Sequence, residues 1–149
     1  MPNAADQKVV DELSKLLANS YTLYLKTQNY HWNVTGPMFT TLHLLFETQY
    51  TELAAAVDEV AERIRALGAF APGSLGAFSK LAEVEEEKGR PLAKDMIQNL
   101  AADQDTVSAS ARAVIEVAEK NADQASVDLA TRRQEAHQKN AWMLRSHLE

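Results

Sequence analysis

The feature that most constrains the fold is a long stretch, residues 38–67, that contains neither glycine nor proline. Apolar side chains recur in it at steps of three and four, namely Leu42, Phe46, Tyr50, Leu53, Val57, Val60, Ile64 and Leu67. This spacing predicts a single amphipathic helix of about eight turns. Pro37 suits the first turn of that helix, and Gly68 is placed to end it. The chain must therefore be organised around one long helix.

Composition and spacing extend this prediction to the whole chain. The 149 residues, of which 46% are hydrophobic, include only five glycines and four prolines, and this favours an all-α fold in a single domain over residues 1–149. A tail, residues 1–5, precedes further helices at about 6–28, 91–119 and 126–148. Residues 68–74 form a linker, and a short helix follows near Phe78 and Leu81. A four-helix bundle with one long crossover between its second and third helices is ferritin-like, here with a short extra helix in that crossover.

Composition also excludes several classes of protein. The sequence has no cysteine, so disulfides and thiolate metal sites are ruled out, and a cytoplasmic location fits. The first residues lack the basic and apolar regions of a signal peptide, and no apolar run approaches the roughly 20 residues of a membrane span. The net charge of −6 argues against broad attraction to nucleic acid.

A second stripe of the long helix carries side chains that bind metals. It consists of His43, Glu47, Thr51, Ala54, Asp58 and Glu62. Asp58 and Glu62 stand one turn apart with the same charge, which weakens a helix unless a cation lies between them. Imidazole and carboxylate together suit a borderline cation such as iron or zinc.

Helix geometry limits where such a metal could bind. Fifteen residues separate His43 from Asp58, which is roughly 22 Å along the axis, whereas metal–ligand bonds are about 2 Å long. Within one chain, His43 cannot share an ion with Asp58 and Glu62. Two copies of the helix crossing antiparallel near Thr51 would bring the two groups together, and a two-fold dimer would do so twice. We therefore expect any site to lie between subunits.

One longer motif resembles a known family. Residues 31–39 read HWNVTGPMF, and His43, Asp58 and Glu62 follow at fixed separations. This pattern resembles the Dps family, the dodecameric miniferritins also called DNA-binding proteins from starved cells. The resemblance implies a ferroxidase centre between two-fold-related subunits, with His31 and His43 from one chain and Asp58 and Glu62 from the other.

The resemblance also implies an activity and an assembly. It predicts a hollow homododecamer that oxidises Fe(II), preferably with hydrogen peroxide rather than oxygen, stores the ferric product as a mineral, and so protects the cell and its DNA from oxidative damage. Zinc is expected as a competing ion. Trp32 would pack near the centre and give up electrons, although such a residue is most often core.

For several acidic residues the sequence allows either a functional or a structural role. Glu47 could join a second iron site or be structural. The resemblance makes Glu119, Asp123 and Asp128 candidates for an acidic pore through which iron enters. Alternatively, these carboxylates only stabilise the N-terminus of a helix. An ordinary surface ion pair is expected between Glu59 and Arg63. The remaining predictions place Trp142 in the core and two histidines at the surface, His137 and His147.

Alternatives to the ferroxidase remain at this point. Family members that bind DNA commonly carry a Lys-rich N-terminal extension, but Lys8 is the only basic residue near this start. We therefore expect no direct DNA binding at physiological salt, which is compatible with a location near the nucleoid. The alternatives are a non-enzymatic cage, DNA-compacting or structural, with a lapsed metal site, and a zinc-binding bundle. The Glu-x-x-His pairs of di-iron sites within one bundle are missing from the sequence.

Overall fold

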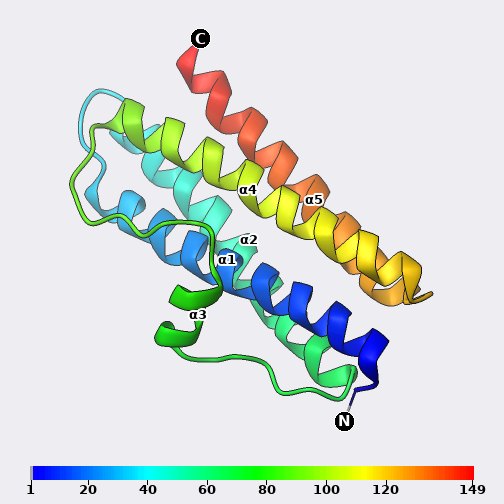
Figure 1. Cartoon of the computed structure of the whole chain (residues 1–149). Helices are drawn as coiled ribbons and strands as arrows, with labels where there is room; N and C mark the ends of the chain where they lie inside the picture. Colours follow the sequence, from blue (N-terminus) through cyan, green and yellow to red (C-terminus); the bar gives the residue numbers. More distant parts are fainter. Residues whose placement is uncertain (1) are drawn as a thin grey trace.

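The computed structural model describes residues 2–149, which form four long helices and one long crossover (Figure 1). The elements are α1 (Ala4–Asn33), α2 (Phe39–Ala66), α3 (Leu75–Leu81), α4 (Ala93–Lys120), α5 (Gln124–Arg145) and a 3-10 turn, η1 (Ser146–Leu148). Residues 2–149 contain no strand, which confirms the all-α prediction. In the same part of the chain, none of the helices combines the length and the hydropathy that crossing a membrane requires.

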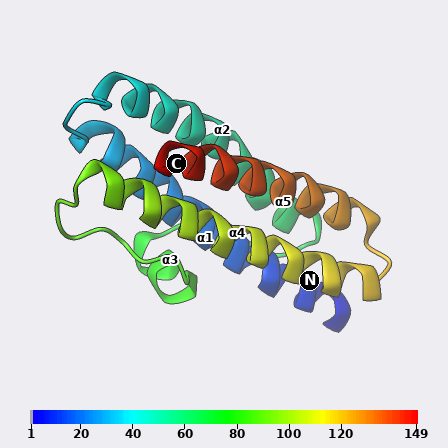
Figure 2. The same ribbon diagram turned by 90° about the horizontal axis from the view of Figure 1, so that it is seen from above.

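The four long helices form two antiparallel pairs. α1 pairs with α2 and α4 with α5, and the crossover that carries α3 makes α2 and α4 run in the same direction (Figures 1 and 2). α3 lies against α1, and the two ends of the chain lie at opposite ends of the bundle. This is the predicted ferritin-like topology with its short extra helix.

α1 is longer than its predicted span of about 6–28. The side chain of Asn3 caps its start by accepting a hydrogen bond from the backbone N–H of Asp6, so residues 4 and 5 of the expected tail are helical, while Met1 lies outside the described residues. The helix continues to Asn33 because no glycine or proline interrupts it before Gly36, which turns the chain with a φ of +103°. His31 consequently belongs to the last turn of α1.

The core includes most of the apolar stripe predicted for α2, together with apolar side chains of α1, α4 and α5. Its members include Val9, Leu13, Leu16, Leu23, Leu42, Phe46, Leu53, Val60, Ile64, Met96, Leu100, Val107, Val114, Leu129 and Leu144. Trp142 is a correction, because its side chain is 65% exposed rather than in the core. It lies one residue past the buried Ala141 and lines a surface cavity together with Asp105 of α4. Leu92 directly precedes α4 and is exposed.

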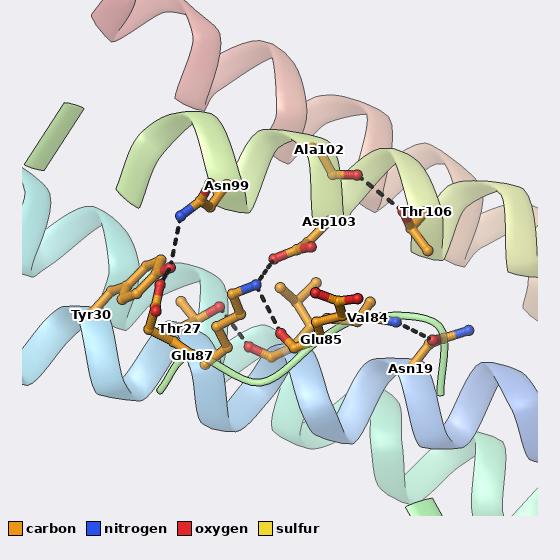
Figure 3. Close-up of polar contacts among 12 residues, drawn as sticks. Asn19, Thr27, Tyr30, Val84, Glu85, Glu87, Asn99, Ala102, Asp103 and Thr106 are labelled. Carbon is orange, nitrogen blue, oxygen red and sulfur yellow. Dashed lines mark hydrogen bonds and ion pairs between the residues drawn. The ribbon is translucent and has the colours of Figure 1, made fainter. Parts of the chain in front are cut away.

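Polar contacts from α1 hold the crossover in place (Figure 3). The buried Asn19 accepts two backbone hydrogen bonds through its Oδ1, from the N–H of Glu83 at 2.7 Å and of Val84 at 3.1 Å. Lys26 donates from Nζ to the backbone oxygen of Glu85 at 2.8 Å. A segment without secondary structure thereby has its backbone groups satisfied along α1.

A second set of contacts joins this segment to α4 (Figure 3). Lys26 pairs with Asp103 at 2.9 Å. Burial raises the pKa of the Asp103 carboxyl, although the positive charge of Lys26 lowers it in part. The hydroxyl of Tyr30 donates to Glu87 and accepts from Asn99 at 3.1 Å. Burial raises the pKa of Tyr30, while the hydrogen bond from its hydroxyl lowers the pKa of Glu87. These contacts fix the α1 segment that leads into the histidine pair.

Candidate metal centre

Two imidazole rings meet where α1 ends and α2 begins. His31 comes from the last turn of α1, and His43 from the start of α2. Their rings stack with centroids 3.8 Å apart and planes inclined by 12°. The side chain of His31 is 7% exposed, and that of His43 is partly exposed. The tight turn at Gly36 brings these two residues of the motif together.

Reciprocal hydrogen bonds set the tautomer of both rings. Nδ1 of His31 lies 2.6 Å from the backbone oxygen of His43, and Nδ1 of His43 lies 2.7 Å from the backbone oxygen of His31. Because a carbonyl oxygen only accepts, each Nδ1 carries the hydrogen. In the neutral ring the lone pair then lies on Nε2, and in the described structure neither Nε2 makes a hydrogen bond. A hydrogen bond of this kind on the other ring nitrogen is what orients metal-ligating histidines.

Aromatic rings pack around the imidazole pair. The ring of Phe39 stacks on His43 at 5.0 Å, and the ring of Tyr50 meets His31 edge-on at 5.3 Å. The sequence placed Tyr50 only in the apolar stripe, and Phe39 only within the motif. The signal that could have found Phe39 is its position one turn before His43, on the same face of the helix. Packing of Phe39 and Tyr50 against the pair helps to hold the rings in one orientation.

The predicted carboxylates lie elsewhere on α2. Asp58 and Glu62 are exposed, as is Glu47, and within residues 2–149 none of the three makes an ion pair or a side-chain hydrogen bond. Nowhere in that same range do three or more His, Asp or Glu side chains gather to hold a metal ion. A single chain thus brings the imidazoles of His31 and His43 together, whereas its candidate carboxylates lie away from them on the exposed face of α2.

Trp32 is on the surface of the chain rather than in its core. Its side chain is 60% exposed and lines a surface cavity of about 380 Å³ between α1 and α3. The walls of that cavity also include Tyr21, Leu25, Leu75 and Phe78. In the described chain no ring contact joins Trp32 to the imidazole pair.

The candidate pore residues differ in what they contact. Asp123 caps α5 by accepting from the backbone of Ser126, and it also binds Arg63 at 2.7 Å. Burial raises the pKa of the Asp123 carboxyl, but the hydrogen bonds from Ser126 and the charge of Arg63 lower it overall. Glu119 and Asp128 are both exposed. Asp123 therefore has a structural role within its own chain.

The partner of Arg63 is a further correction. The sequence predicted an ion pair between Glu59 and Arg63 one turn apart, but Glu59 instead binds Arg132 of α5 at 2.7 Å. Arg63 turns to Asp123 because the loop between α4 and α5 presents that carboxylate beside it. Two ion pairs between elements replace one within α2.

His137 was predicted at the surface, and this is wrong. Its ring is fully buried between α4 and α5. Nδ1 donates to Oε1 of Gln104 at 2.7 Å, and Nε2 accepts from Arg133 at 3.2 Å. Arg133, itself 5% exposed, also binds both carboxylate oxygens of Glu52. Burial, with the charge of Arg133, lowers the pKa of His137 to about 3.

Comparisons with known proteins agree with this architecture. Residues 10–149 match the ferritin-like domain. The DNA protection during starvation protein of Brevibacillus brevis is 33% identical over the full length of both chains. The crystal structure of a Dps protein from Bacillus brevis superimposes with a TM-score of 0.96 over all of both chains, again at 33% identity.

The chain belongs to the Dps family of ferritin-like proteins. The description of a third relative also names a type of metal chemistry. The Dps protein from Vibrio cholerae O1 superimposes with a TM-score of 0.93 at 32% identity, covering 97% of this chain and 91% of its own. That protein is described as a member of a broad superfamily of ferritin-like diiron-carboxylate proteins.

Proposed function

We propose that this Dps protein oxidises Fe(II) at a centre shared by two subunits and stores the ferric product inside a hollow homododecamer. His31 and His43 of one subunit and Asp58 and Glu62 of a second would hold the iron, which is the substrate. The description of the Vibrio cholerae relative as a diiron-carboxylate protein supports this chemistry.

The observation that carries the proposal is the imidazole pair. Two stacked rings are locked through Nδ1, and in the described structure the Nε2 of each makes no hydrogen bond. Two nitrogen donors alone bind a metal weakly, so the site needs further ligands. Asp58 and Glu62 are exposed and unpaired in the described chain, but they lie roughly 22 Å or more along the helix from His43. Only a neighbouring subunit can present such carboxylates to the rings.

The donor set suits oxidation of iron. Carboxylate oxygens are hard anionic donors that favour Fe(III) over Fe(II), so Asp58 and Glu62 lower the barrier to losing an electron. Two imidazoles complete a sphere that leaves positions open for an oxidant. Hydrogen peroxide is the preferred oxidant in this proposal, because a two-electron acceptor facing two Fe(II) ions is reduced without releasing hydroxyl radical.

Protection of DNA would then follow from removal of iron and peroxide. The Brevibacillus brevis relative is named for DNA protection during starvation. With a net charge of −6, this chain would protect without direct binding to duplex DNA at physiological salt. Iron would approach through acidic surfaces that include Glu119 and Asp128, both exposed, rather than through Asp123, which is bound to Arg63.

The proposal is tested by stopped-flow oxidation of Fe(II) under anaerobic conditions with added peroxide, and separately with oxygen. Wild-type protein should oxidise iron fast, and faster with peroxide. His31→Ala/His43→Ala should assemble to the same mass near twelve subunits by light scattering but oxidise iron slowly. The control is His147→Ala, which alters a histidine whose Nδ1 bonds only to the backbone of Met143. Wild-type rates in the double variant would refute the site, and tight zinc binding without iron turnover would refute the activity.

A further inference from the structure

A layer of buried polar side chains crosses the interior of the four-helix bundle. His137 of α5 donates from Nδ1 to Oε1 of Gln104 on α4 at 2.7 Å, and its Nε2 accepts from Arg133 at 3.2 Å. Arg133 in turn binds Glu52 of α2 through both of its terminal nitrogens. His137, Gln104 and Arg133 are each no more than 5% exposed. We call these side chains the polar layer, and it connects α2, α4 and α5 inside the bundle.

Gln49 of α2 lies at the same level of the bundle. α2 runs antiparallel to α5, because α2 and α4 share one direction and α5 reverses it (Figures 1 and 2). Glu52 lies against Arg133. One helical turn back along α2, from Glu52 to Gln49, therefore corresponds to one turn forward along α5, from Arg133 to His137. The side chain of Gln49 is 4% exposed, so it faces the interior at the level of His137.

Three buried polar atoms at this level have no hydrogen-bond partner among the described residues. They are Oε1 and Nε2 of Gln49 and Nε of Arg133. Leaving a buried amide and a buried guanidinium N–H unsatisfied destabilises a fold, and such groups in folded proteins are nearly always bonded to protein or to ordered water. A small ligand within hydrogen-bond reach of both side chains would satisfy them.

The hydrogen-bonding capacity of these atoms selects the ligand. Nε of Arg133 and Nε2 of Gln49 are donors and need an acceptor, whereas Oε1 of Gln49 is an acceptor and needs a donor. A halide ion accepts hydrogen bonds but does not donate them. A metal cation does not accept them, and the charge of the guanidinium repels it. A water molecule accepts and donates at once, and two to four polar partners are what a buried water requires.

The side chains of the polar layer also do not suit an interior metal site. Ferritin-like proteins that bind iron inside one bundle use Glu and His side chains from facing helices. Here Gln49 and Gln104 supply amides, and both nitrogens of His137 are already engaged in hydrogen bonds. The carboxylate of Glu52 is bound to Arg133. This interior level therefore favours a neutral ligand.

We propose that the polar layer binds one ordered water molecule between the amide of Gln49 and Nε of Arg133. The water accepts a hydrogen bond from Arg133 and donates one to Oε1 of Gln49. It completes the polar layer, and this position in the bundle takes water rather than iron. The water site lies within a single chain, so it stands whether or not a centre shared by two subunits oxidises iron.

High-resolution crystal structures of the assembled protein test the water site directly. Wild-type protein should show a density peak within hydrogen-bond distance of Nε of Arg133 and Oε1 of Gln49, with no anomalous signal there after soaking in bromide or in Fe(II). Gln49→Met should lose the peak. The control Gln98→Met, which removes an exposed amide of α4, should keep it. The absence of a peak in wild-type crystals, or bromide or iron in its place, would overturn the proposal.

Thermal unfolding at one subunit concentration provides a second test, in which the sign of the effect decides. If water bridges Gln49 and Arg133, Gln49→Met leaves the guanidinium N–H unsatisfied, and the midpoint should fall by about 2–4 °C or more. If the amide of Gln49 is simply unpaired, a methionine of similar volume removes that penalty and the midpoint rises, which would contradict the water site.

The control for this sign is again Gln98→Met, which should change the midpoint little, as surface substitutions do. A fall as large as that of Gln49→Met would show that the loss comes from the methionine and not from the water site. Should Gln49→Met fail to assemble, the wild-type crystals alone decide between a water, an ion and no ligand.

Discussion

The molecule contains two kinds of histidine site, and they differ in which nitrogens remain available. At the junction of α1 and α2, His31 and His43 use Nδ1 on backbone oxygens and keep Nε2 free. Between α4 and α5, His137 uses both nitrogens, donating to Gln104 and accepting from Arg133. The first arrangement can bind a metal, whereas the second has no lone pair to offer.

The difference teaches that burial alone does not identify a ligand. His31 is 7% exposed and His137 is fully buried, so both would count as interior residues. What separates them is the source of their hydrogen bonds. Backbone oxygens orient His31 and His43. Side chains of α4 and α5 orient His137, and Glu52 of α2 in turn binds Arg133. The first site leaves both Nε2 atoms without a hydrogen bond in the described structure, and the second holds α2, α4 and α5 together.

The largest predicted difference between the two histidine sites is in metal affinity. His43→Ala removes one Nε2 but keeps the backbone oxygen that orients His31, so only a ligand is lost. Zn(II) binding, measured by calorimetry as a probe of the proposed iron site, should weaken by about 100-fold or more, since even an outer partner is worth about 10- to 100-fold. His137→Gln should leave the zinc affinity unchanged. Equal losses in both variants would break the comparison.

The next effect is acid sensitivity. The pKa of His137 is about 3 in the folded chain and about 6.5 when unfolded, so below pH 6.5 the unfolded chain takes up a proton that the folded chain refuses. The unfolding free energy that the neutral His137 imidazole contributes is fully present above pH 6.5. It is lost as pH falls toward 3, at up to about 1.4 kcal/mol per pH unit. Urea unfolding between pH 7 and 5 should show this slope.

His137→Gln provides the control for that slope. Glutamine retains a donor toward Gln104 and an acceptor toward Arg133 but does not titrate. The variant should be less stable at neutral pH and should lose less stability on acidification. If the unfolding free energy of both proteins falls equally with pH, the acid sensitivity does not come from the lowered pKa of His137.

A smaller effect comes from two neighbouring ion pairs between α2 and α5. Glu52 binds the buried Arg133, and Glu59 binds the exposed Arg132. Glu52→Gln leaves a buried guanidinium without its counter-charge and should cost roughly 1–3 kcal/mol of unfolding free energy, reduced because Glu52 itself is half exposed. Glu59→Gln should cost less than about 1 kcal/mol. Chemical unfolding of both variants at one subunit concentration measures the difference, and equal costs would contradict it.

The smallest predicted effect concerns packing at the imidazole pair. Phe39 stacks on His43 but is 42% exposed, so Phe39→Ala removes only part of an aromatic contact. Zn(II) affinity should fall by about twofold to fivefold, as expected from less than about 1 kcal/mol of ring packing. A loss as large as that of His43→Ala would mean that the backbone hydrogen bonds do not hold the ring.

Much of the fold could be predicted from the sequence, because helix periodicity and the crossover are local or compositional features. The approach of His31 to His43 was implied by the family motif, but their reciprocal hydrogen bonds depend on how α1 and α2 cross. His137 was misread because charged and amide side chains surround it in sequence. Its spacing of four from both Arg133 and the buried Ala141 was the available signal that it lies on the inner face of α5.

The central claim is that each centre is divided between two subunits, and mixed assembly tests it most directly. Subunits with His31→Ala/His43→Ala are refolded together with subunits carrying Asp58→Ala/Glu62→Ala. Each mixed dimer then holds one complete centre and one that lacks all four ligands. Random pairing should restore about a quarter of wild-type Fe(II) oxidation, since half the dimers are mixed and half their centres are complete. Mixed cages no more active than either parent would contradict the account.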